Sequence, residues 1–374
     1  MKTPPTFARR LAHIATVALL FFFTITPLSD PLSFPQLAHL VLAMGAFPLI
    51  IGAMIYFTPT LTRSAPPQGW IGWWPILAFL VGGIAYTAVS QELNLIYVAA
   101  PLGIAVCGGL LFWMNGRIKN SLGDPHPGLA WYQGAIFFLI IGLLAIILAQ
   151  LQPEWWWTLR NIHQQINLMG FIGLTTIGTL QVFLPTVAHY PDPTTGLRLK
   201  QHLKYALIGT IFLAAGAAQI AFCSLIGRAI WLIPLLALAH SVWINQDKMQ
   251  NSSGAALPIF GALLGFIGLT ILGETTTLPY LFAFFLFPLV TGALSHLLPL
   301  WWWPGFPAPN REKAQAFLGK VGILLLLGFY GAGIASIWNQ EWGGWIALGT
   351  LILFAGRLLV AKIKFRESKQ SGLE

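Results

Sequence analysis

Apolar runs long enough to cross a bilayer dominate the sequence and constrain its fold more than any other feature. A membrane span needs about 20 mostly apolar helical residues, and the chain of 374 residues is 56% hydrophobic and only 8% charged. This composition predicts an all-α polytopic membrane protein, folded as a single membrane domain over residues 1–374. The length criterion gives about twelve transmembrane helices. They cover residues 10–27, 36–58, 71–90, 93–115, 128–150, 160–187, 202–223, 228–244, 254–273, 279–299, 314–336 and 343–362.

The distribution of basic residues predicts how the chain is oriented. With the N-terminus on the cytoplasmic side, all of the 20 lysines and arginines except Arg160 and Arg228 lie in inner segments or beside them. Cytoplasmic loops carry the excess of Lys and Arg, so this pattern predicts that both termini are cytoplasmic. The net charge of +9 is then a sign of topology. It calls for no nucleic-acid partner.

A short element recurs near the inner end of every fourth predicted helix. It begins with Gly, a small residue and Met or Leu, and ends with Pro at Gly52–Pro59, Gly178–Pro185 and Gly292–Pro299. Locally, Gly permits close helix contact and Pro ends a helix. The regular spacing predicts, in addition, three pseudo-repeated four-helix units. These units cover about residues 10–115, 128–244 and 254–362.

Two histidines lie within the outer ends of predicted helices. His39 is about one turn inside the 36–58 run, and His163 is at the same level in the 160–187 run, with Asn167 one turn further on the same face. A membrane-embedded imidazole is costly and suggests function, and neutral imidazole binds haem iron or copper. The alternative is an interfacial histidine bonded to a helix carbonyl or to water.

The two histidines are not at equivalent positions when residues are counted back from Pro59 and Pro185, which end the first two Gly-to-Pro elements. The equivalent of His39 on the second helix is Gln165, and His39 and His163 point about 160° apart in a common frame at roughly 100° per residue. We therefore expect that the two rings need not face one shared site.

Acidic residues are placed away from the middle of every predicted span. Those on the outer side all fall in loops, which argues against a proton pump or a transporter that relies on a buried carboxylate. They are Asp30, Glu92, Glu154, Glu274 and Glu341. The other histidines lie at the inner side, where we expect solvated or headgroup-facing side chains. They are His13, His126, His189, His202, His240 and His296.

Two segments carry a resemblance to a known group. HQQINLMGFIGLTTIGTLQVFLPT (163–186) resembles the membrane helices fused to some bacterial multicopper oxidases, and HLVLAMGAFPLIIGAMIYFTP (39–59) is similar to a helix that carries a haem ligand. With its twelve predicted helices, the chain resembles the haem-copper oxidase catalytic subunit and the related NnrS family.

The resemblance implies a haem- or copper-binding protein of a bacterial inner (cytoplasmic) membrane. Its cofactor would be b-type haem or copper, and its role would be in respiratory, nitrogen-oxide or metal-handling metabolism. His39 and His163 would be the cofactor ligands, with Gln165 and Asn167 beside the metal. A redox protein or other membrane subunits would be its partners.

Several departures from the oxidase pattern argue against a complete terminal oxidase. The sequence contains no His-His pair, and Asn167 stands where the oxidase pattern has a tyrosine. Residues 278–287 contain no histidine, and the late Gly-His-Thr-Gly-Arg motif of the NnrS type is absent. A transporter or channel, or an assembly partner without metal, therefore remains an alternative with the same architecture.

Overall fold

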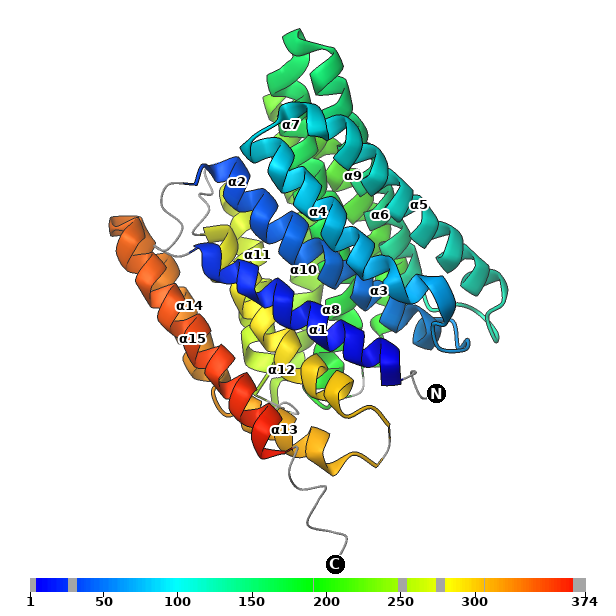
Figure 1. The fold of residues 1–374 in the computed structure, drawn as a ribbon, viewed down its shortest axis with the longest axis vertical. Coiled ribbons are helices and arrows are strands. Elements are labelled where there is room, and N and C mark those ends of the chain that lie inside the picture. Colours follow the sequence, from blue (N-terminus) through cyan, green and yellow to red (C-terminus); the bar gives the residue numbers. More distant parts are fainter. Residues whose placement is uncertain are drawn as a thin grey trace, which may run out of the picture. The chain divides into compact units, whose positions relative to one another are not determined.

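The computed structural model describes residues 5–25, 32–190, 192–247, 254–273, 280–305 and 307–365, and these form helices and their connections (Figure 1). Within them, eight helices are long and apolar enough to cross a membrane, or nine if the bent pair Pro309–Gly319 and Gly322–Trp338 is one span. The chain is therefore a multi-pass, all-helical protein suited to a lipid bilayer. Asp30, Glu274 and the ends of two predicted helices, residues 26–27 and 279, lie outside the described residues.

The chain divides into two compact units. The first comprises Ser33–Val182 and Asp192–Leu238. Its elements are α2 (Phe34–Ala38), η3 (His39–Ala46), α3 (Phe47–Leu61), η4 (Gly69–Trp73), α4 (Trp74–Ser90), η5 (Leu93–Leu95), α5 (Ile96–Lys119), α6 (Gly128–Leu151), η6 (Pro153–Trp155), α7 (Trp156–Gln165), η7 (Ile166–Gly173), most of α8 (Leu174–Val187), α9 (Thr195–Ala217) and most of α10 (Ala221–Ile244).

The second unit comprises Lys2–Leu32, Phe183–Pro191 and Ala239–Glu374. In it α1 packs on α12, and α14 lies beside α15 along most of its length (Figure 1). Its elements are α1 (Pro5–Phe22), η1 (Phe23–Ile25), α11 (Ala256–Leu272), η10 (Tyr280–Leu286), α12 (Phe287–Trp302), α13 (Pro309–Gly319), α14 (Gly322–Trp338) and α15 (Gln340–Lys364).

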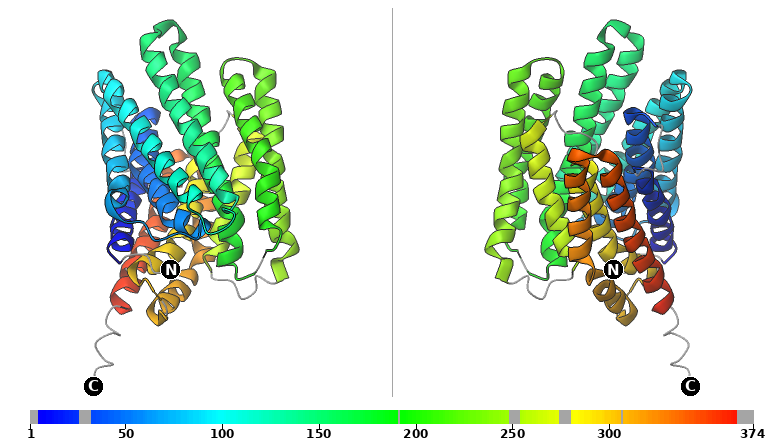
Figure 2. Two further views of the ribbon diagram at one scale, coloured as in Figure 1. Left: turned by 90° about the vertical axis from the view of Figure 1, so that its right-hand side faces the viewer. Right: turned by 90° about the vertical axis from the view of Figure 1, so that its left-hand side faces the viewer.

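The boundary predicted between residues 223 and 228 is wrong. The chain turns instead between α9 and α10, where Gln219 has a positive φ of 71°. Arg228 stays inside the helix because its Nη2 donates to Ser224 Oγ one turn earlier, at 3.0 Å. Gly227 is a packing residue, since a Cβ there would lie 2.8 Å from the Gly209 carbonyl oxygen. Both views of Figure 2 show the resulting antiparallel pair in light green.

The helix predicted over residues 314–336 is also different in the structure. It is divided into α13 and α14, which meet at an angle of 41°. The following connection is shorter than predicted, because α15 begins directly after Asn339. The Asn339 side chain accepts hydrogen bonds from the backbone N–H groups of Glu341 and Trp342, at 2.8 and 3.2 Å, which caps the new helix.

Three π-helical stretches precede the three Gly-to-Pro elements. They are η3, η7 and η10, and each is followed directly by the α-helix that carries the element. In the first and third, the next helix begins with Phe47-Pro48 or Phe287-Pro288. A proline lacks the N–H that would continue the α-helical ladder, which favours a wider turn just before it. The segments FPLIIGAM (47–54) and FPLVTGAL (287–294) are the sequence signal for this feature.

Candidate functional site

The two outer histidines lie at the ends of π-helical stretches in the first unit. His39 is the first residue of η3, and His163 is on α7, three residues before η7 begins. A π-helical turn inside an α-helix frequently marks a functional site, because it redirects the side chains at its end. Both side chains are partly buried.

Each imidazole is oriented by a backbone carbonyl. His39 Nδ1 lies 2.8 Å from the carbonyl oxygen of Pro35 on α2, and His163 Nδ1 lies 2.8 Å from that of Gly142 on α6. A carbonyl oxygen only accepts, so in both rings Nδ1 carries the proton. The lone pair of the neutral imidazole is therefore on Nε2. This is how a metal-binding histidine is commonly held.

The two rings lie near each other and almost parallel. Their centroids are 6.4 Å apart, and the angle between their planes is 7°. Further along the same two segments, Phe47 and Phe171 pack edge to face with centroids 6.0 Å apart. The pair of histidines is thus supported by contacts along the two helices.

The expectation that the two histidines need not face one site is not what the structure shows. It assumed that a shared site requires the same face on both helices. When two similar helices pack side by side in the same orientation, each contacts the other through a different face, as in a heterologous contact between subunits. Positions about 160° apart in a common frame can therefore face each other across one interface, as His39 and His163 do.

Asn167 lies beside His163. Its Nδ2 is 3.2 Å from both ring nitrogens of His163. Because Nδ1 carries the proton, the Asn167 amide can donate only to Nε2. Asn167 Oδ1 is buried and has no hydrogen-bond partner among the described residues. The position predicted for a metal neighbour is therefore occupied by a side chain that fixes the histidine.

Gly142 is a residue of this site that sequence reasoning missed. It contributes its carbonyl oxygen to His163, and a Cβ at this position would lie 2.4 Å from Asn167 Oδ1. Only glycine allows α6 to approach η7 so closely. The sequence offers no local signal for this role, because the run around Gly142 is uniformly apolar.

Gln165 and Arg160 flank the pair on α7. Gln165 is the last residue of α7, and in the described part of the chain it makes no recorded hydrogen bond with either histidine. The Arg160 guanidinium lies over the Trp157 ring, 5.5 Å from its centroid. It is also within electrostatic range of both imidazoles.

The other titratable groups are dispersed. Within the described residues, no three His, Cys, Asp or Glu side chains are grouped so as to hold a metal ion. Glu92, Glu154 and Glu341 are exposed at helix ends. His126, in the connection before α6, accepts the Gly128 N–H at Nδ1, at 3.1 Å, and its burial lowers the pKa of the imidazole.

A buried ion pair was not foreseen from the sequence. Arg198 Nη2 lies 2.8 Å from Asp192 Oδ2, and Arg198 Nε donates to Gln181 Oε1 at 3.2 Å. Gln181 belongs to the second Gly-to-Pro element, so this network anchors the start of α9 to α8.

No protein-family model, curated protein or solved structure matches the chain. The chemistry of the candidate site therefore rests on the histidine pair itself.

Proposed function

We propose that this protein binds a transition metal, as haem iron or as copper, through His39 and His163. The observation that carries the proposal is the arrangement of the pair. Both rings donate from Nδ1 to a backbone carbonyl, and they lie parallel at 6.4 Å. The lone pair of each neutral imidazole is on Nε2, and a metal cation would bind there, in place of the Asn167 amide at His163.

The separation of the rings fits a shared metal. Metal–imidazole bonds are about 2.0–2.1 Å long, and with ring centroids 6.4 Å apart His39 and His163 are near enough that both could hold one ion. Haem iron and copper both accept imidazole nitrogen, and either would supply one-electron redox chemistry.

The residues around the two histidines orient the imidazole rings. The carbonyl oxygens of Pro35 and Gly142 fix the tautomer and ring orientation, and the Asn167 amide lies against His163 Nε2. Such outer partners raise ligand basicity and limit ring motion.

The protein is further proposed to be a divergent member of the haem-copper-oxidase-like group. We propose twelve spans with both termini cytoplasmic, in a bacterial inner membrane, and a role in respiratory, nitrogen-oxide or metal-handling metabolism. The sequence lacks the paired histidines and the tyrosine of an oxygen-reducing centre. We therefore expect neither cytochrome c oxidase nor quinol oxidase activity, and no gain of either from Gln165→His.

An absorption spectrum and a metal analysis of one purified sample test the proposal. A histidine-ligated haem gives a Soret band that moves on reduction, and copper is detected directly by elemental analysis. Protein from haem- and copper-replete cells that is colourless and copper-free would refute it. That result would favour a transporter or channel, or an assembly partner, with no metal.

A further inference from the structure

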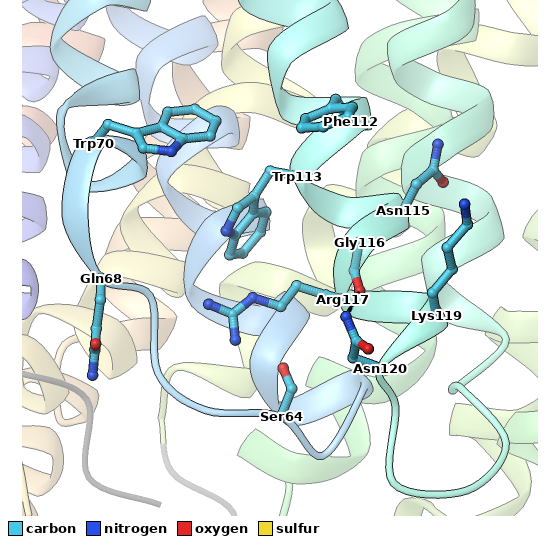
Figure 3. Close-up of a pocket in the computed structure, with 10 residues that line it drawn as sticks. All are labelled: Ser64, Gln68, Trp70, Phe112, Trp113, Asn115, Gly116, Arg117, Lys119 and Asn120. Carbon is cyan, nitrogen blue, oxygen red and sulfur yellow. Dashed lines mark hydrogen bonds between the residues drawn. The ribbon is translucent and has the colours of Figure 1, made fainter.

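A cavity of about 690 Å³ opens in the first unit at the end of α5. Its volume falls within the range of small-molecule sites, about 300–1,000 Å³. Its walls come from the connection after α3, from η4 and from the last two turns of α5 (Figure 3). The lining residues are Ser64, Gln68, Trp70, Phe112, Trp113, Asn115, Gly116, Arg117, Lys119 and Asn120.

One end of the cavity carries the Arg117 guanidinium, and the Lys119 side chain extends away from it (Figure 3). Arg117 and Lys119 both line the cavity, and no acidic side chain does. Arg117 is held in place, because Nη1 donates to the Ala65 carbonyl oxygen at 2.9 Å and its guanidinium lies over the Trp113 ring at 5.2 Å from the centroid. A fixed guanidinium retains further N–H donors in a planar fork, which matches the oxygens of a phosphate.

The other end is aromatic. Figure 3 shows the Trp70 and Phe112 rings on one side of the cavity and Ser64, Arg117 and Asn120 on the other. Phe112 is 78% exposed and Trp70 is 49% exposed. An indole at the membrane interface and an exposed phenyl ring on a spanning helix are suited to contact lipid. The cavity therefore fits an occupant with an anionic head and an apolar tail.

We propose that this cavity binds the phosphate headgroup of an anionic phospholipid. The Arg117 guanidinium donates to the phosphate, Lys119 adds positive charge at another part of the cavity wall, and the acyl chains lie along Phe112 and Trp70. Basic pockets between membrane helices on the cytoplasmic side are the typical binding sites of such headgroups. The distribution of basic residues predicts that this end of α5 is cytoplasmic. Inorganic phosphate shares the headgroup chemistry but would leave the aromatic end without a partner.

Native mass spectrometry of the full chain, released from detergent with added lipid, tests the proposal. Phosphatidylglycerol is the probe, phosphatidylcholine the neutral control, and inorganic phosphate the headgroup without chains. We expect phosphatidylglycerol to be retained, and the Arg117→Gln/Lys119→Gln variant to bind it at least about tenfold more weakly, since it removes the positive charge of the cavity. The variant Lys200→Gln/Lys204→Gln removes the same charge from exposed positions of α9 and should bind like the wild type.

Equal retention of phosphatidylglycerol by wild type and the Arg117→Gln/Lys119→Gln variant would overturn the proposal. So would equal binding of phosphatidylcholine, or inorganic phosphate that binds as tightly as the lipid. If the double variant fails to elute as a single species, Arg117→Lys decides the matter. It keeps the charge but loses the planar fork, so it should still weaken lipid retention, whereas Lys200→Gln should not.

Discussion

A Cβ atom on Gly142 would lie 2.4 Å from Asn167 Oδ1, so α6 and η7 can approach only with glycine at this position. The same glycine presents its carbonyl oxygen to His163. Helix packing and the orientation of the His163 ring thus depend on one residue without a side chain.

Gly142→Ala should loosen the site. The added methyl group forces Asn167 aside, and overpacking of this kind costs about 1–3 kcal/mol. We expect a lower thermal midpoint and a lower metal content than in the wild type. Gly108→Ala is the matched control, because a Cβ on Gly108 meets no atom within 4 Å. Equal thermal midpoints for the two variants would show that the close approach at Gly142 is unimportant.

Arg198→Ala should be among the most destabilising single changes. Arg198 and Asp192 are 8% and 4% exposed, and removing one partner of a buried pair costs about 3–5 kcal/mol because the other charge remains buried. Thermal unfolding in detergent measures the loss. Lys200→Ala, two residues further and exposed, should change stability by at most about 0.5 kcal/mol. A similar small effect for Arg198→Ala would contradict the role assigned to the network.

His126 should make stability depend on pH. Burial lowers the pKa of its imidazole in the folded protein, so the unfolded chain, with a pKa of about 6.5, binds the proton more readily. Its contribution is complete above about pH 6.5 and is lost as the pH falls toward the folded-state pKa. Protonation also removes the Nδ1 acceptor for the Gly128 N–H.

The comparison with His126→Ala isolates this effect. The difference in thermal midpoint between wild type and variant should be larger at pH 7.5 than at pH 5. A difference that stays constant, or grows as the pH falls, would show that His126 does not titrate as inferred.

The sequence predicts much of the helical architecture because apolar runs and their basic flanks are local signals. His39, His163 and Asn167 were also identified from the sequence, since polar groups in apolar runs are conspicuous. The break at Gln219 is missed because the sequence places the boundary between residues 223 and 228, just before the charged Arg228. In the structure Gly227 packs on α9 and Arg228 bonds to Ser224 of its own helix. The contacts of Gly142 could not be foreseen, because they depend on how closely two helices approach.

The contact between the His39 and His163 rings could not be predicted for a similar reason. Counting residues gives the face of each helix, but it does not give the direction from which a neighbour arrives. That direction depends on helix packing around η3 and η7. The π-helical turns themselves had a sequence signal in Phe47-Pro48 and Phe287-Pro288, but η7 has no such proline.

The metal-to-protein ratio of His39→Ala and His163→Ala, measured beside the wild type on purified protein, tests the central claim most directly. We expect bound haem iron or copper in the wild type, loss of most of it in each of the two variants, and full retention in His126→Ala. The Soret band, if haem is the cofactor, should follow the same order. A metal content that is unchanged in both His39→Ala and His163→Ala, or no bound metal in the wild type, would contradict the assignment of this pair as a metal site.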